Sequence, residues 1–114
     1  MTPFEPGEVV LIRFPFTDLS AVKKRPAVVV SPRELSTRHE DVTLIALTSQ
    51  PQNDPDLSVQ DLQCAGLPRP TWLKPLIATI SANLIDRRLG RLAPVDESRV
   101  QSTLRRLIAA KFAV

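Results

Sequence analysis

The chain has 114 residues, of which 43% are hydrophobic and 24% charged, a composition typical of a soluble globular protein. We therefore expect a single domain over residues 1–114. Its one cysteine, Cys64, excludes an internal disulfide, and its one histidine, His39, excludes chemistry that needs two histidines within one chain. No apolar run approaches the roughly 20 residues of a membrane-spanning helix. We expect a cytoplasmic protein with no membrane partner.

The net charge of +3 is unevenly distributed along the chain. Residues 61–114 carry nine Lys and Arg against four Asp and Glu, whereas residues 1–60 carry six against eight. The first half nevertheless contains the basic cluster Lys23-Lys24-Arg25. A basic patch on a nearly neutral body suits a polyanion such as nucleic acid. Solvated surface charges without a ligand would give the same composition.

Three strands are predicted in the first half of the chain. Glu8–Phe14 is rich in Val, Ile and Phe, and a polar loop follows it up to Arg25. Pro26–Ser31 is a short β-branched apolar run, which predicts a strand buried on both faces. Pro32–Asp41 is a polar connection with room for a helical turn, and Val42–Thr48 is the third strand.

The next segments predict further short strands. Leu57–Leu62 is expected to form a weak edge strand. A strand over Thr71–Ile80 is interrupted by Pro75, so it lies at a sheet edge there or carries a bulge, because proline cannot donate to a ladder. Leu84–Leu92 is expected to contain a turn at Gly90 and a short strand.

From Pro94 onward the apolar period changes to that of a helix. Asp96 and Glu97 suit the positive end of its dipole. Four apolar residues at helical spacing are expected to pack in the core: Val100, Leu104, Leu107 and Ile108. About five to seven short strands followed by one helix indicate a mainly β protein, a small closed antiparallel barrel.

Two sequence positions suggest a binding or catalytic site. Pro26 restricts the backbone of Arg25, so a planar guanidinium able to hold a phosphate is fixed at the start of a buried strand. Thr48, Ser49 and Gln50 follow an apolar run and place three hydrogen-bonding side chains at a strand end. An arginine in water or paired with Asp18, and a strand end with polar caps, explain the same residues without a function.

Three other residues admit both functional and structural interpretations. His39 is the one side chain that ordinarily titrates near neutral pH, but it stands in a polar segment typical of an exposed loop. Trp72, near Arg69 and Lys74, could stack a base or belong to the core or an interface. Cys64 has no base beside it in the sequence and is expected to be inert.

The chain resembles the MazF/PemK family of toxins from type II toxin–antitoxin modules. The resemblance covers nearly the whole chain in the family's order. Its strongest parts are GEVVLIRFPFTDLSAVKKRPAVVVS (residues 7–31) and TLIALTSQ (residues 43–50), followed by GLPRPTWLKP (residues 66–75) and LGRL (residues 89–92).

The resemblance implies a MazF/CcdB-like toxin fold, an SH3-like barrel with a C-terminal helix, working as a homodimer. It implies metal-independent, sequence-specific cleavage of single-stranded RNA, with no cofactor, to 2′,3′-cyclic phosphate and 5′-hydroxyl ends. The catalytic arginine and threonine of the family fall on Arg25 and Thr48. The loop over residues 15–24 would border the RNA, with Asp18, Lys23 and Lys24 as contacts beside Ser49 and Gln50. A cognate antitoxin with an acidic disordered segment is the implied partner.

The first loop departs from the family pattern. Many members carry a Glu and one or two Gly there, whereas this chain has Asp18 as its one acidic residue between Pro15 and Arg25. The general base is therefore left open. Two other functions also stay open: a gyrase poison of the same fold, and a non-catalytic barrel that binds nucleic acid or protein.

Overall fold

The computed structural model of the chain describes residues 3–13 and 24–109. Five antiparallel strands form one sheet in the order β4-β3-β2-β1-β5. Their bounds are β1 Glu8–Arg13, β2 Lys24–Val29, β3 Asp41–Thr48, β4 Trp72–Ser81 and β5 Ile85–Arg91. The mainly β fold with a C-terminal helix is confirmed. The predicted strand end at Phe14 and the loop residues Asp18 and Lys23 lie outside the described residues.

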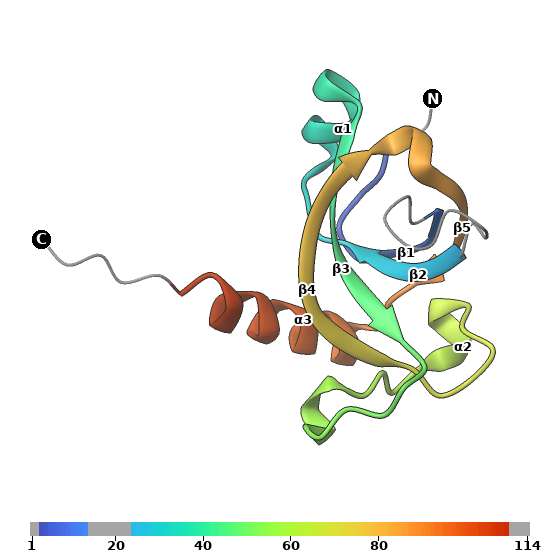
Figure 1. Cartoon of the computed structure of the whole chain (residues 1–114), viewed down its shortest axis with the longest axis vertical. Helices are drawn as coiled ribbons and strands as arrows, with labels where there is room; N and C mark the ends of the chain where they lie inside the picture. Colours follow the sequence, from blue (N-terminus) through green and yellow to red (C-terminus); the bar gives the residue numbers. More distant parts are fainter. Residues whose placement is uncertain (1–2, 14–23, 110–114) are drawn as a thin grey trace, which may run out of the picture.

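The sheet curls so that the long strands β3 and β4 lie across from the shorter β1, β2 and β5 (Figure 1). β4 and β5 stand at the two ends of the strand order, and no ladder joins them within the described residues. The closure expected from the sequence is therefore not made by hydrogen bonds between these strands. The single turn of 3-10 helix η2, Ala82–Leu84, connects β4 to β5 instead.

Pro75 interrupts the ladder between β3 and β4 as predicted. Ile45 pairs with Ile77, but the next residue, Ala46, pairs with Lys74, so Pro75 and Leu76 form a bulge on β4. β4 is also an edge strand of the sheet. A proline is tolerated at such a position because its missing N–H costs no ladder bond.

The central strands are buried on both faces, as expected for the run that begins at Pro26. Consecutive residues of β2 alternate between two apolar clusters: Val28 belongs to one, and Ala27 and Val29 belong to the other. β1 alternates in the same way with Val9 and Val10, both fully buried. β2 begins two residues before Pro26 and ends at Val29, two residues before the predicted end.

The edge strand predicted over Leu57–Leu62 is wrong. The segment contains the end of the 3-10 helix η1, Pro55–Leu57, and the start of the short helix α2, Leu62–Ala65. Two aspartates impose these turns: Asp54 accepts a hydrogen bond from the Asp56 N–H at 2.9 Å, and Asp61 accepts one from the Cys64 N–H at 2.9 Å. Only an isolated bridge from Ser58 to Trp72 resembles strand pairing here.

The predicted turn at Gly90 is also wrong, because β5 runs through this residue. The glycine serves a close approach between backbones: a Cβ atom at Gly90 would lie 2.6 Å from the carbonyl carbon of Ala65. Gly66 approaches β5 reciprocally, since its Cβ would lie 2.0 Å from the Leu89 carbonyl oxygen. The two glycines let the end of α2 rest directly on β5.

Two further helices complete the fold, and local sequence predicts them only in part. α1, Arg33–His39, realises the helical turn expected between Pro32 and Asp41. α3, Pro94–Leu107, begins as predicted, but its apolar stripe is not all core. Val100 is buried, whereas Leu107 is 41% exposed and Ile108 69% exposed, because the C-terminal half of α3 projects away from the sheet (Figure 1). No helix in the described ranges is long and apolar enough to cross a membrane.

Candidate phosphate-binding cleft

Arg25 and Thr48 lie where the ladder between β2 and β3 ends. The last pair of this ladder is Ala27 with Ala46. Arg25 and Thr48 each lie two residues beyond this pair, so the same register, if continued, would bring them opposite each other. Residues opposite each other in an antiparallel pair present their side chains to the same face. The two positions singled out in the sequence therefore lie close together, and both line one cleft.

A cleft of about 550 Å³ opens at this point. Both Arg25 and Thr48 line it, and so does Ser49. The described lining comes from β1, β2, β3, β5 and the segment between α2 and β4: Leu11, Lys24, Arg25, Pro26, Leu47, Thr48, Ser49, Gly66, Leu67, Pro68, Arg69, Thr71, Arg87 and Leu89. Gln50 is exposed beside the cleft and is not among these residues.

Pro26 allows the strands to separate beside Arg25. Residues 24–26 of β2 pair with β1 alone, through Arg25 with Ile12 and Pro26 with Leu11. Pro26 has no N–H to offer β3, so the ladder stops and the space towards Thr48 becomes cleft. The same proline restricts Arg25 to extended backbone, which fixes the origin of its exposed side chain.

The Thr48 hydroxyl is oriented by the chain that follows it. Its Oγ1 accepts a hydrogen bond from the Gln50 N–H at 3.1 Å, and the residue is only 8% exposed. A hydroxyl that accepts one bond keeps its own hydrogen for donation. Thr48 therefore offers the cleft a held donor, and Gln50 contributes through its backbone to this geometry.

Lys24 carries its charge at the mouth of the cleft, where Asp86 partly offsets it. Lys24 Nζ donates to Asp86 Oδ2 at 3.3 Å, and Arg13 donates to Asp86 Oδ1 at 3.4 Å. The hydrogen bond from Lys24 is the main reason that the pKa of Asp86 lies below its usual value, while desolvation acts in the opposite direction. The Asp86 carboxylate of β5 thus pairs with Arg13 at the end of β1 and with Lys24 at the start of β2.

The described lining of the cleft carries four cationic side chains and no carboxylate. Two of them, Arg69 and Arg87, were not identified as site residues from the sequence. Arg69 could have been noticed because Pro68 and Pro70 flank it, a rigid setting like that of Arg25 before Pro26. No local sequence pattern marks Arg87 as a site residue, since its position in the cleft depends on the pairing of β5 with β1.

The remaining candidates lie outside the cleft lining. His39 is exposed at the end of α1, as expected for a solvated histidine. Trp72 is half-buried and pairs with Thr48 across the β3–β4 ladder, so it packs beside the site. Cys64 is exposed on α2, and its N–H is bonded to Asp61. Among the described residues, no group of three His, Cys, Asp or Glu could hold a metal ion.

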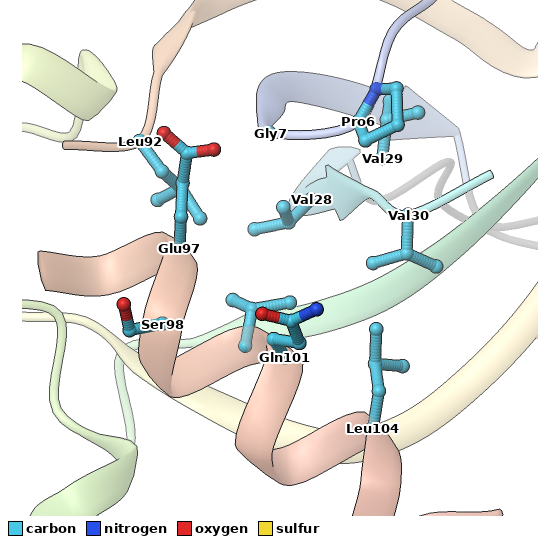
Figure 2. A pocket seen from close by; sticks show the side chains of 11 residues that line it. Pro6, Gly7, Val28, Val29, Val30, Leu92, Glu97, Ser98, Gln101 and Leu104 are labelled. Carbon is cyan, nitrogen blue, oxygen red and sulfur yellow. The ribbon is translucent and has the colours of Figure 1, made fainter. Parts of the chain in front are cut away.

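A second groove, of about 310 Å³, runs between α3 and β2. Figure 2 shows Val28 and Val30 on one side facing Gln101 and Leu104 of α3 on the other, with Glu97 at the end near Gly7. Its described lining carries one charged side chain, that of Glu97, and no cation, unlike that of the basic cleft. None of the candidate site residues identified in the sequence lines it.

Many solved structures share this fold, and three of them illustrate the similarity. A MazE–MazF complex from Deinococcus radiodurans matches with a TM-score of 0.78 at 18% identity, over 97% of this chain and 100% of that chain. The Mycobacterium tuberculosis toxin MazF-mt6 matches with a TM-score of 0.72 at 15% identity, over 92% and 99%. A mycobacterial endoribonuclease in complex with its cognate antitoxin matches with a TM-score of 0.69 at 15% identity, over 99% and 100%. At these low identities, the TM-scores establish a common fold.

The family is established by sequence. The comparison with curated proteins gives no significant match. The family described as PemK-like, MazF-like toxins of type II toxin–antitoxin systems matches residues 5–108, which is most of the chain. The chain therefore belongs to the PemK-like, MazF-like toxin family of type II toxin–antitoxin systems.

Proposed function

We propose that the protein is an endoribonuclease that cleaves single-stranded RNA in the cytoplasm without a metal ion. The carrying observation is that Arg25 and Thr48 line one cleft whose described lining has four cations and no carboxylate. Support also comes from the family match and from the endoribonuclease from a mycobacterial species that shares the fold. Such a cleft suits a polyanion.

In the proposed reaction, the 2′-oxygen of one ribose attacks the adjacent phosphorus and the bond to the 5′-oxygen breaks. The products are a 2′,3′-cyclic phosphate and a 5′-hydroxyl end. Arg25 stabilises the charge that develops on the non-bridging oxygens and donates a proton to the leaving oxygen, while Thr48 donates a hydrogen bond to the same phosphate. Donors held in place before the reaction lower the barrier because they need no reorganisation.

The proton of the attacking 2′-hydroxyl needs an acceptor. Arginine cannot serve at neutral pH, since its pKa lies above about 12. No Asp or Glu belongs to the described lining of the cleft, so the described residues offer no carboxylate there that could accept this proton.

Asp18 is the one acidic residue of the sequence between β1 and β2, and we propose it as an RNA contact together with Lys23.

The direct test is to incubate the purified protein with a long single-stranded RNA in EDTA and to map the ends. We expect cleavage at a short sequence, with 2′,3′-cyclic phosphate and 5′-hydroxyl ends. A matched RNA with a 2′-deoxy residue at the cut site should resist, because its nucleophile is missing. Efficient cutting of the deoxy site, or binding without cutting, would contradict the proposed reaction.

We further propose that the protein acts as a homodimer and is inhibited by an antitoxin with an acidic disordered segment. The exposed Leu107 and Ile108 on the projecting end of α3 offer apolar surface for a second copy. The basic cleft offers a surface on which a string of Asp and Glu can compete with RNA. Light scattering should give twice the mass of one chain, and Ile108→Lys should lower this mass towards that of one chain.

A further inference from the structure

We propose that Arg69 and Arg87 bind the phosphates that flank the scissile phosphate, so that they set the position of the RNA strand without taking part in bond breaking. The inference rests on the proposed function and extends it to two arginines that the sequence left without a role. Both line the same cleft as Arg25 and Thr48, and both side chains are exposed to solvent.

The backbone around Arg69 is held rigidly. Pro68 and Pro70 fix their own φ angles, and Pro70 also keeps Arg69 out of helical geometry. The Thr71 hydroxyl donates to the Arg69 carbonyl oxygen at 2.8 Å, and Thr71 itself is buried. Arg69 therefore starts from a fixed backbone, and less conformational entropy is lost when its guanidinium binds.

Arg87 is placed by the register of three strands. Leu11 of β1 pairs with Pro26 on one side and with Arg87 on the other. Two inter-strand spacings separate the backbones of β2 and β5, which is about 10 Å. Arg25, which precedes Pro26, and Arg87 thus start from two strands separated by β1, an arrangement that suits successive phosphates better than one phosphate.

Neither guanidinium is neutralised within the described part of the chain. No ion pair or hydrogen bond of the Arg69 or Arg87 side chain is found there, whereas Lys24 donates to Asp86 at 3.3 Å. The neighbouring Arg88 points to the other face of β5, where it lies over the Phe4 ring at 4.1 Å and pairs with Glu8. Arg69 and Arg87 thus leave planar donor groups free for phosphate oxygens.

The test measures binding and cleavage separately. The probe is a labelled RNA of mixed sequence in which every 2′-hydroxyl is methylated, so that it keeps its phosphates and cannot be cut. Binding is titrated over a range of salt concentrations for the native protein, Arg69→Gln and Arg87→Gln. Arg38→Gln is the matched control, since Arg38 is an exposed arginine of α1, at the opposite end of β3 from Thr48.

Each cleft variant should bind about tenfold more weakly at low salt. Each should also lower the slope of log K against log salt by about 0.7, the value for one phosphate on a single strand. In cleavage of natural RNA, KM should rise while kcat stays within about threefold, because the flanking contacts are the same in ground and transition states. Arg69→Lys and Arg87→Lys should restore the slope, and thermal unfolding should not change.

The inference would be overturned if both variants kept the native slope of log K against log salt, or if their loss of RNA affinity only equalled that of Arg38→Gln. This holds even if the native protein cleaves RNA. Native binding without cleavage, with the slopes still lowered by the variants, would overturn the proposed reaction and support the phosphate contacts. A fall in kcat with unchanged KM would assign the two arginines to catalysis instead. A native protein that neither binds nor cleaves RNA would overturn both.

Discussion

Arg25 and Thr48 line the same cleft, each two residues beyond Ala27 and Ala46, the last pair of β2 and β3 before Pro26 stops the ladder. This relationship brings to one cleft a cation on restricted backbone and a neutral donor whose oxygen is held by the Gln50 N–H. It also separates their expected contributions, because a charged hydrogen-bond donor stabilises a developing negative charge more than a neutral donor does.

We expect Arg25→Ala to lower the cleavage rate more than Thr48→Ala, with a loss of about 10²–10³-fold for one held donor. Thr48→Ser keeps the hydroxyl and should retain most of the activity. Single-turnover rates at saturating RNA measure the effect, and circular dichroism checks that each variant folds. A fully active Arg25→Ala protein would refute the assignment of this residue.

Gly66 is expected to tolerate no side chain. Gly66→Ala would place a Cβ atom 2.0 Å from the Leu89 carbonyl oxygen at a φ of +72°. Left-handed strain and overpacking together should lower the free energy of unfolding by about 3 kcal/mol or more. Gly7→Ala is the matched control, because Gly7 also has a positive φ but its Cβ would meet only the Glu97 side chain at 3.5 Å. Urea denaturation should show a clearly smaller loss for Gly7→Ala.

We expect Asp96 to contribute more to the free energy of unfolding than an exposed acidic residue in the first turn of a helix contributes. Its carboxylate is 2% exposed and accepts hydrogen bonds from the Gln60 and Asp61 N–H groups at 2.8 and 3.0 Å. Asp96→Ala would leave two donors unsatisfied and should lower the free energy of unfolding by about 3 kcal/mol. Glu97→Gln in the same turn should have little effect. Equal denaturation midpoints for the two variants would contradict this role.

Asp86 should titrate below its usual pKa, because Lys24 and Arg13 favour its charged form. The folded protein then binds this proton less tightly than the unfolded chain. The resulting stabilisation is present above the ordinary carboxyl pKa and is lost as the pH falls through the lowered folded value. In NMR titrations, Lys24→Gln should raise the pKa of Asp86 more than Arg13→Gln, and added salt should raise it in the native protein. No change in either variant would show that these contacts do not form in solution.

The proposed antitoxin should compete with RNA for the basic cleft. As salt rises, its association rate should fall steeply, while its affinity should fall only in part because an apolar anchor must contribute to tight binding. Titrating the antitoxin against a labelled, uncleavable RNA on this protein measures the competition. Simultaneous occupancy without mutual displacement would place the inhibitory contact elsewhere on the molecule.

Local sequence patterns determine much of the fold. β-branched apolar runs predict β1, β2 and β3 within two residues at most of their described ends, and the change to helical period after Ala93 predicts the start of α3. Pro75 predicts the bulge in β4. These features depend on side chains close together in sequence, whose steric and hydrogen-bonding preferences act locally.

The order of the family motifs in the sequence also led to the hypothesis that Arg25 and Thr48 act in one catalytic site. The cleft around them required the tertiary structure. Arg87 enters it because β5 pairs with β1, and Arg69 enters it because Gly66 and Gly90 let α2 rest on β5. Local sequence predicted a turn at Gly90, and it predicted that Asp96 interacts with the positive end of the helix dipole. The contacts of these two residues in the structure are different ones. Their actual contacts lie more than twenty residues away, where strand register and close packing decide which groups meet.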